Sequence, residues 1–246
     1  MFIKEYGRGP RVFFGLHGWS GDHSTFAPLV NYMPAEATFA SADLPGYGQS
    51  AGTADLTLAG LAGVVADAME RIERPTFALV GNCSGALVGL TALELRPSLV
   101  GRVERLVLIA PVAYTPWNFR FFVSPPIGRY AYYSTFANPL GRWLTNLSLR
   151  GHRAEETDLT HSFSAVDHAV SYRYLEMLTG IGSIDRWEGI RLETDLVYGA
   201  RTFGAIRKSI GMWRAMWPHA RLHELQTAGH LPIQEATEEL SRILFR

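Results

Sequence analysis

The sequence predicts an α/β fold in which helices flank a mostly parallel central sheet and an additional helical cap is inserted. Continuous apolar runs recur along the chain, and segments with helical spacing separate them. Strands that are covered on both faces have such continuous apolar runs, which is typical of parallel sheets. A third observation is that residues 113–189 are rich in aromatic side chains and lack a buried-strand pattern. This stretch is the expected insertion.

The expected strands and helices alternate along the chain. The strands are predicted from the apolar runs at residues 11–18, 37–46, 76–81, 103–111, 194–200 and 221–229. Helical spacing of apolar side chains occurs at residues 56–72, 86–97 and 235–246. Because no repeat or flexible linker divides the chain, we expect a single α/β domain over residues 1–246. The cap at 113–189 would lie within that domain.

Composition excludes several classes of partner. The 23 basic and 23 acidic residues balance, so the net charge favours neither nucleic acid nor an anionic membrane. No apolar run approaches the roughly 18 residues of a membrane span. The single cysteine cannot form an internal disulfide, and the first residues lack a signal-peptide pattern, so we expect a reducing, cytoplasmic setting. The oligomeric state stays open.

The single cysteine lies where a strand is expected to turn into a helix. Gly81-Asn82-Cys83-Ser84-Gly85 fits the pattern G-x-S-x-G with cysteine in place of serine. The two glycines permit a strained turn, and the N-terminus of the following helix supplies free N–H groups and a positive dipole end. We expect this setting to favour a thiolate. A lone cysteine is more often a small buried residue, but its position identifies Cys83 as the candidate nucleophile.

Two histidines follow predicted strands on the side of the sheet where Cys83 emerges. His230 follows the last strand, where active sites of open α/β sheets form, and it is the expected base. His17 follows an earlier strand, and we expect it to be structural. The loop after His17 could turn backbone N–H groups inward, so the N–H groups of Trp19 and Ser84 are the expected oxyanion hole.

Together these motifs resemble the α/β-hydrolase superfamily over nearly the whole chain. The matching pieces are His17-Gly18-Trp19, "DLPGYGQS" at residues 43–50, Gly81 to Gly85, and Ala228-Gly229-His230. The resemblance implies a cap inserted where residues 113–189 lie. Among cap-bearing members, the length and the "HGW" motif are similar to those of carrier-protein methyl ester esterases.

The chain departs from the superfamily pattern in two ways. Most relatives have serine where Cys83 stands, although dienelactone hydrolases and polyhydroxyalkanoate synthases use cysteine. The resemblance also implies an aspartate in G-x-x-D after the penultimate strand, but Thr202 occupies that position. Because a thiol ionises more readily than a hydroxyl, a Cys-His pair can work without a carboxylate.

Several groups could orient His230 in place of that aspartate. Thr202, a backbone carbonyl or water could do so, and so could one of three cap carboxylates, Asp158, Asp167 and Asp185. We expect Asp43 to hold the turn that follows it, and Asp195 to lie at the wrong end of its strand. The sequence does not select among the remaining candidates.

The cap composition suggests a substrate class. Residues 114–153 contain five arginines and ten aromatic residues but no aspartate, glutamate or lysine. Packing explains many of the aromatic residues, whereas the unbalanced arginines suggest contact with the phosphates of coenzyme A or an acidic acyl carrier protein. The expected substrate contacts in the cap are Arg120, Arg129, Arg142, Trp117 and Trp143.

These observations lead to a hypothesis of acyl transfer through an acyl-cysteine. The expected enzyme is a thioesterase, or an acyltransferase or cyclase, acting on a small-molecule apolar or aromatic acyl thioester. The alternatives are a carboxylic-ester or lactone hydrolase of the dienelactone type, and a catalytically silent ligand-binding protein. No metal is expected, since the histidines lack the spacing of a ligand cluster, and no organic cofactor is implied.

Overall fold

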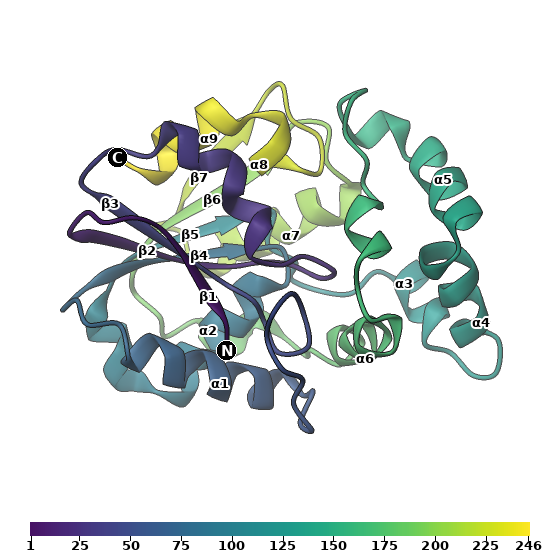
Figure 1. Ribbon diagram of the computed structural model, residues 1–246, viewed down its shortest axis with the longest axis horizontal. Coiled ribbons are helices and arrows are strands. Elements are labelled where there is room, and N and C mark those ends of the chain that lie inside the picture. The colour runs from purple at the N-terminus through teal and green to yellow at the C-terminus, as the bar shows by residue number, and fades with distance from the viewer.

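The computed structural model describes all 246 residues and contains one seven-stranded sheet. Its strands are β1 (Ile3–Gly7), β2 (Arg11–Leu16), β3 (Ala37–Ala42), β4 (Phe77–Asn82), β5 (Val103–Ile109), β6 (Glu193–Gly199) and β7 (Arg221–Leu225). Their order is β1-β3-β2-β4-β5-β6-β7, and only β1 runs antiparallel to its neighbour (Figure 1). The predicted mostly parallel sheet is therefore confirmed, and each of the six apolar runs overlaps a strand.

Strand β1 is the one strand that the apolar runs do not predict. It pairs with β3 at the edge of the sheet, with Ile3 opposite Ala42. Lys4 and Glu5 in its middle are exposed, so it has no continuous apolar run. Charged residues on an edge strand discourage pairing with another chain.

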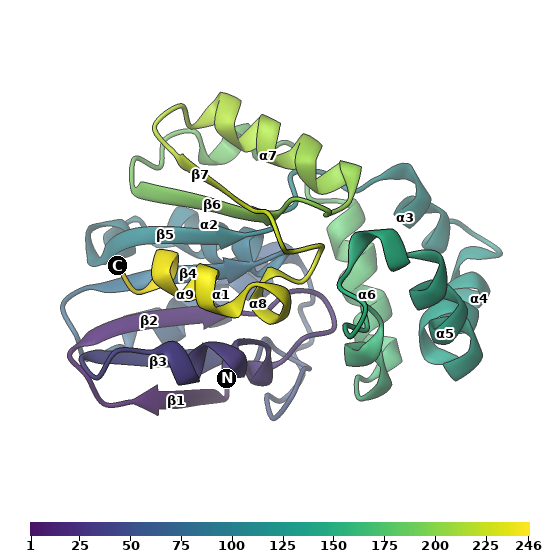
Figure 2. The same cartoon turned by 90° about the horizontal axis from the view of Figure 1, so that it is seen from above.

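Helices cover both faces of the sheet (Figures 1 and 2). The larger apolar core packs one face against α1 (Leu58–Glu70), α2 (Gly85–Leu95) and α7 (Gly204–Met216). A second core packs the other face against the 3₁₀ helix η1 (His23–Tyr32), α8 (Pro232–Glu235) and α9 (Thr237–Leu244). A further 3₁₀ helix, η2 (Pro97–Arg102), precedes β5. Burial from both sides explains why the central strands are continuously apolar.

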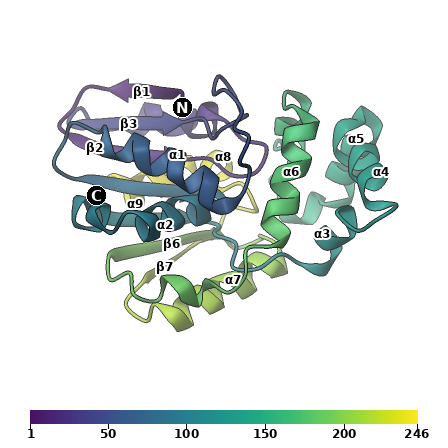
Figure 3. The same ribbon diagram turned by 90° about the horizontal axis from the view of Figure 1, so that it is seen from below.

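The chain between β5 and β6 contains only helices and turns. They are α3 (Trp117–Phe122), α4 (Gly128–Tyr132), η3 (Tyr133–Ala137), α5 (Pro139–Ser148), η4 (Arg150–His152), η5 (His161–Ser164), α6 (His168–Thr179) and η6 (Ile184–Trp187). Helix α6 lies beside one end of the sheet, and α3, α4 and α5 lie farther out (Figures 1 and 3). We refer to residues 113–189 as the cap.

The cap has a small core of its own. Tyr132, Phe136, Phe163 and Leu175 are buried together, and Trp19 from the main domain packs against them. The N–H groups that begin α5 and α6 are capped by the side chains of two residues, Asn138 and Asp167. None of the helices is both long and apolar enough to cross a bilayer.

Candidate active site

The turn after β4 has the strained geometry that the glycine pattern predicts. Cys83 has a φ of +52°, in the left-handed region, and its N–H donates to the carbonyl of Ile109 at 2.8 Å. A Cβ at Gly81 would lie 2.5 Å from Ala86, and one at Gly85 would lie 2.3 Å from a backbone oxygen. Only glycine fits at these two positions, and Cys83 is thereby turned away from the sheet.

Cys83 and His230 line the same cavity, which has a volume of about 400 Å³. Both residues are partly accessible, as a nucleophile and a base must be. The cavity contains no lysine or arginine, and its aromatic lining consists of Trp19, Phe119, Phe136, Phe163 and Phe203. A larger hollow of about 620 Å³, between β1 and α1, contains none of the predicted site residues. Cys83, His230 and Trp19 therefore line one cavity under the cap, whose lining includes these five aromatic side chains.

His230 is positioned by its backbone, by a ring contact and by a hydroxyl. Its N–H donates to the carbonyl of His152 at 2.8 Å, and its ring packs against Phe203 with centroids 4.5 Å apart. Its Nδ1 lies 3.2 Å from the Oγ1 of Thr202. If Nδ1–H donates to this hydroxyl, Nε2 carries the lone pair that a general base needs.

The three cap carboxylates are engaged elsewhere. Asp158 accepts hydrogen bonds from Thr160, Asp167 caps α6, and Asp185 bonds with Ser183. None of them contacts His230, so the residue hydrogen-bonded to its Nδ1 is Thr202. There is also no hydrogen bond between the Cys83 thiol and the imidazole.

Burial of Cys83 works against the thiolate that the turn and the helix N-terminus are expected to favour. Burial raises the pKa of the thiol to about 11, and the N–H of Ser84 offsets only part of that effect. Burial also lowers the pKa of His230 to about 4, with a further contribution from nearby His152. Burial therefore disfavours the charged forms of both side chains, the thiolate and the imidazolium.

The proposed oxyanion donors are the N–H group that follows Cys83 in sequence and one from the loop after β2. The backbone N–H groups of Trp19 and Ser84 donate to no protein oxygen. The loop that carries Trp19 lies against the nucleophile, since a Cβ on Gly18 would be 2.8 Å from that of Cys83. Two free N–H groups beside a nucleophile can receive a developing oxyanion.

The His17 side chain stabilises this loop through hydrogen bonds to the backbone. Its Nδ1 lies 2.8 Å from the carbonyl of Gly18, and its Nε2 accepts the N–H of Leu44 at 2.9 Å. The side chain is fully buried, and burial lowers its pKa. Neighbouring Asp43 accepts N–H groups from His23 and Gln49 and so holds the turn after β3. Both residues have the structural contacts that the sequence predicts.

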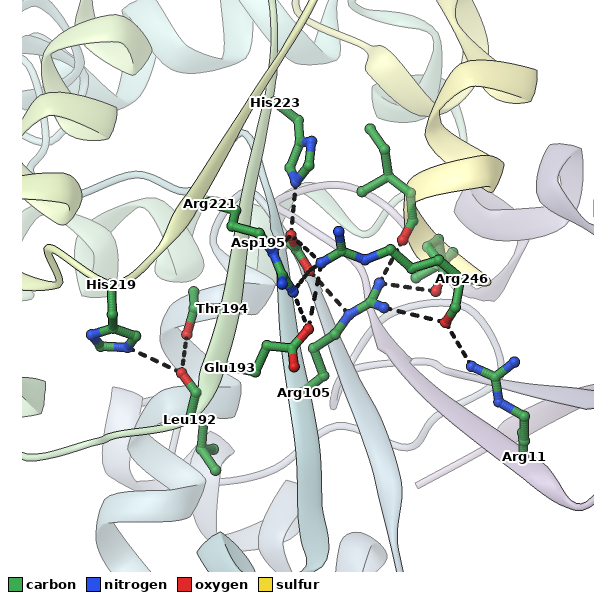
Figure 4. Close-up of polar contacts among 12 residues, drawn as sticks. Arg11, Arg105, Leu192, Glu193, Thr194, Asp195, His219, Arg221, His223 and Arg246 are labelled. Atoms are coloured by element: carbon green, nitrogen blue, oxygen red, sulfur yellow. Dashed lines mark hydrogen bonds and ion pairs between the residues drawn. The ribbon is translucent and has the colours of Figure 1, made fainter.

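Asp195 lies in the first half of β6, within a buried ionic network that contains no cavity-lining residue (Figure 4). Its carboxylate contacts Arg105 at 3.0 Å and His223 at 2.7 Å, and it also pairs with Arg221 and Arg246. Burial alone would raise its pKa, but hydrogen bonds from Arg221 and His223 outweigh this and hold the pKa below its ordinary value. This carboxylate cannot orient His230.

The predicted substrate contacts of the cap lie outside the cavity lining. Trp117 and Trp143 are 82% and 60% exposed. Arg142 donates to carbonyl groups within the cap, and Arg129 lies over the rings of two tyrosines. Arg120 is exposed. The aromatic lining comes instead from residues that the sequence does not single out.

Glu235 is a further residue near the site that has no sequence signal. Its carboxylate accepts the N–H of Gly229, beside His230, and the N–H of Ala154 in the cap at 2.8 Å. It therefore joins the histidine loop to the cap. No spacing rule links a glutamate on a C-terminal helix to these two backbone groups, so only the structure reveals the contact.

Comparison with known proteins assigns this fold to a family. The family model described as "Alpha/beta hydrolase family" matches residues 13–243. The chain therefore belongs to the α/β-hydrolase family, which confirms the resemblance seen in the motifs. Solved structures agree in fold, among them an esterase from Thermogutta terrifontis with a TM-score of 0.78 and 16% identity, covering 99% of this chain and 90% of that one. An enol-lactonase from Burkholderia xenovorans has a TM-score of 0.72 and 17% identity, covering 99% and 94%.

Among curated proteins, the chain is similar to two carrier-protein ester esterases. A pimeloyl-[acyl-carrier protein] methyl ester esterase of Methylococcus capsulatus is 34% identical over 106 residues, which is 43% of this chain and 40% of the relative. One from Stenotrophomonas maltophilia is 33% identical over 117 residues, or 47% and 40%. The matched region thus spans about two fifths of the length of these relatives.

Proposed function

We propose that the chain is an esterase-type hydrolase in which Cys83 accepts the acyl group of an apolar ester or thioester. One observation supports this most strongly. A cysteine in a strained strand-to-helix turn shares a partly aromatic cavity with a histidine, and the backbone N–H groups of Trp19 and Ser84 donate to no protein oxygen. Nucleophile, base and oxyanion donors are the parts that acyl transfer requires.

The proposed reaction begins with both side chains neutral. The Sγ of Cys83 attacks the acyl carbon while Nε2 of His230 accepts the thiol proton. The carbonyl oxygen becomes an oxyanion held by the N–H groups of Trp19 and Ser84. When the intermediate collapses, the leaving alcohol or thiol takes the proton from His230. Water, activated by the same imidazole, then hydrolyses the acyl-cysteine. Substrate binding must bring thiol and imidazole together, since catalytic hydrogen bonds often form only in the complex.

The cavity favours an apolar acyl group. Five aromatic side chains line it, and its charged lining includes Asp22 and Asp158 but no cation. An anionic carrier would therefore remain outside the cavity. Thioesters suit a cysteine nucleophile, because thiolate attack exchanges one thioester for another. The names of the curated relatives support an ester bound to a carrier protein. Because coenzyme A also forms thioesters, the proposed substrates include both coenzyme A and carrier-protein esters.

We also propose a reducing, cytoplasmic setting, because the thiol of Cys83 must stay unoxidised to react.

Intact-mass measurement tests the proposal directly. Incubation with hexanoyl-CoA and with 4-nitrophenyl hexanoate should give an acyl adduct on the wild-type chain, together with turnover. Cys83→Ala should give neither, and His230→Gln should bind ligand while losing turnover. Ligand binding without adduct or turnover in the wild type would instead support the catalytically silent protein. Turnover of the nitrophenyl ester alone would favour the oxygen-ester or lactone alternative.

A further inference from the structure

The outer helices of the cap expose an unusual number of large apolar side chains. Twelve such residues are exposed in the whole chain, and eight of them fall between residues 117 and 147. We call these eight the tip surface: Trp117, Phe121, Ile127, Tyr130, Leu140, Trp143, Leu144 and Leu147. Their helices, α3, α4 and α5, lie together at the end of the molecule farthest from the sheet (Figures 1 to 3). Exposed apolar side chains gathered in this way mark interaction sites.

Helix α5 shows the arrangement most clearly. Leu140, Trp143, Leu144 and Leu147 follow helical spacing and are 63%, 60%, 51% and 47% exposed. At about 100° per residue, Thr145 lies on the opposite side of the helix, and it lines the cavity. An amphipathic helix normally turns its apolar stripe toward a core. Here the stripe faces solvent, although the other side of the helix borders the cavity.

The same part of the chain carries unbalanced positive charge. Residues 114–153 hold five arginines and no acid, whereas the rest of the chain has 18 basic and 23 acidic residues. Arg120, Arg129 and Arg150 are exposed, and none of them forms an ion pair. The net charge of zero therefore conceals an excess of arginine in residues 114–153 of an otherwise acidic chain.

We propose that the tip surface binds to an anionic lipid bilayer. Tryptophan and tyrosine favour the interface between headgroups and acyl chains, leucine and phenylalanine insert just below it, and arginines pair with lipid phosphate. A second copy of the chain is a poorer occupant, because it would bring two acid-free, arginine-bearing surfaces together. The chain would lie on the bilayer rather than cross it. This proposal does not depend on the chemistry of Cys83.

Vesicle co-sedimentation tests the proposal on the full chain. We expect binding to phosphatidylcholine vesicles that contain about one third phosphatidylglycerol to be roughly 100-fold tighter than to pure phosphatidylcholine, at about fivefold per exposed arginine. The double variant Leu144→Glu/Leu147→Glu should weaken binding at least about tenfold, since insertion of its two leucines is lost. Leu95→Glu, an exposed leucine on α2, is the matched control and should bind like the wild type.

Other results would overturn the proposal. These are equal binding to both vesicle types, no binding, or binding that the double variant leaves unchanged. A dimer in light scattering that the double variant dissociates, without vesicle binding, would assign the surface to a second copy. Binding of an acidic carrier protein in place of vesicles, abolished by the same variant, would assign it to that partner. Should the double variant fail to fold by circular dichroism, Trp117→Glu on α3 gives the same readout from another helix.

Discussion

Thr202 offers His230 a hydroxyl where the superfamily pattern has a carboxylate, and these two groups act differently on an imidazole. A carboxylate both orients the ring and stabilises its protonated form. The hydroxyl, 3.2 Å from Nδ1, can orient the ring but supplies no charge. This agrees with the pKa of about 4 at His230, which no neighbouring acid raises. Such a weak base is better matched to a thiol than to the less acidic hydroxyl of serine.

Substitution of Thr202 should separate orientation from charge. We expect Thr202→Val to lower kcat/KM about tenfold, the upper range for one lost hydrogen bond, with KM nearly unchanged. Thr202→Ser, which keeps the hydroxyl, is the control and should retain most activity. Steady-state kinetics on a nitrophenyl or CoA ester provide the measurement. A large gain from Thr202→Asp would show instead that the site is impaired and needs its acid.

The protonation state of Cys83 predicts a pH profile for its alkylation. Because the thiol has a pKa of about 11, its thiolate fraction should rise tenfold per pH unit from pH 6 to about 10. The rate of carbamidomethylation by iodoacetamide, followed by intact mass, should rise in the same proportion. Cys83→Ala should show no single-site adduct. Rapid alkylation that is independent of pH near neutrality would reveal a thiolate-imidazolium pair and contradict this picture.

The residues proposed as nucleophile and base could be placed from sequence because each follows a recognisable strand, whereas Thr202 was only one of several candidates for the partner of Nδ1. Cys83, Thr202 and His230 come after β4, β6 and β7, and parallel strands deliver such residues to one edge. The pKa values could not be predicted in this way, since they depend on burial from several segments. The motif predicts that a helix N-terminus lowers the pKa of the thiol. Burial of the side chain instead raises that pKa.

At the scale of elements, the histidine loop and the cap are held together through one carboxylate. Glu235 in α8 accepts N–H groups from Gly229 and Ala154, and His230 donates its N–H to the carbonyl of His152 in η4. The loop therefore gains much of its order from the cap. Sequence could predict a loop and a cap but not the side chain that joins them, because this contact is tertiary.

Removal of that carboxylate should loosen both segments. We expect Glu235→Ala to lower kcat/KM about tenfold or more and to lower the free energy of unfolding by roughly 1–3 kcal/mol, because two partly buried N–H groups lose their acceptor. Hydrogen exchange should increase at residues 150–154 and 228–231. Glu238→Gln, an exposed residue of α9, is the control and should change neither quantity. Unchanged hydrogen exchange at residues 150–154 and 228–231 would show that Glu235 does not hold the histidine loop to the cap.

Sequence and structure also differ at a polar strand and at an amphipathic helix. The apolar runs do not predict strand β1, because its middle residues are charged and exposed. Helix α5 has an apolar stripe whose direction periodicity cannot determine, since a pattern shows that one side is apolar but not which neighbour covers it. The cap arginines were assigned to substrate on composition alone, and composition carries no information about which side of a helix faces a cavity.

At the scale of the molecule, the sheet has two ends with different chemistry. The carboxyl end meets the cap and carries the cavity, whereas the ionic network of Asp195 involves the first half of β6 and the C-terminal segment (Figure 4). The overall alternation of strands and helices was predictable, because it depends on local apolar runs. The distribution of charge was not, since a balanced total does not reveal the excess of arginine in the cap.

The distance between these two ends of the sheet affects which substitutions the chain can tolerate. Substitutions at sites that share no partner usually add in their effects on stability, and active sites commonly trade stability for activity. Because Asp195 and its arginines share no contact with Cys83 or His230, the two ends are open to independent selection. Substitutions that strengthen the ionic end could then offset the strained turn and desolvated pair at the other, leaving the catalytic geometry free to vary.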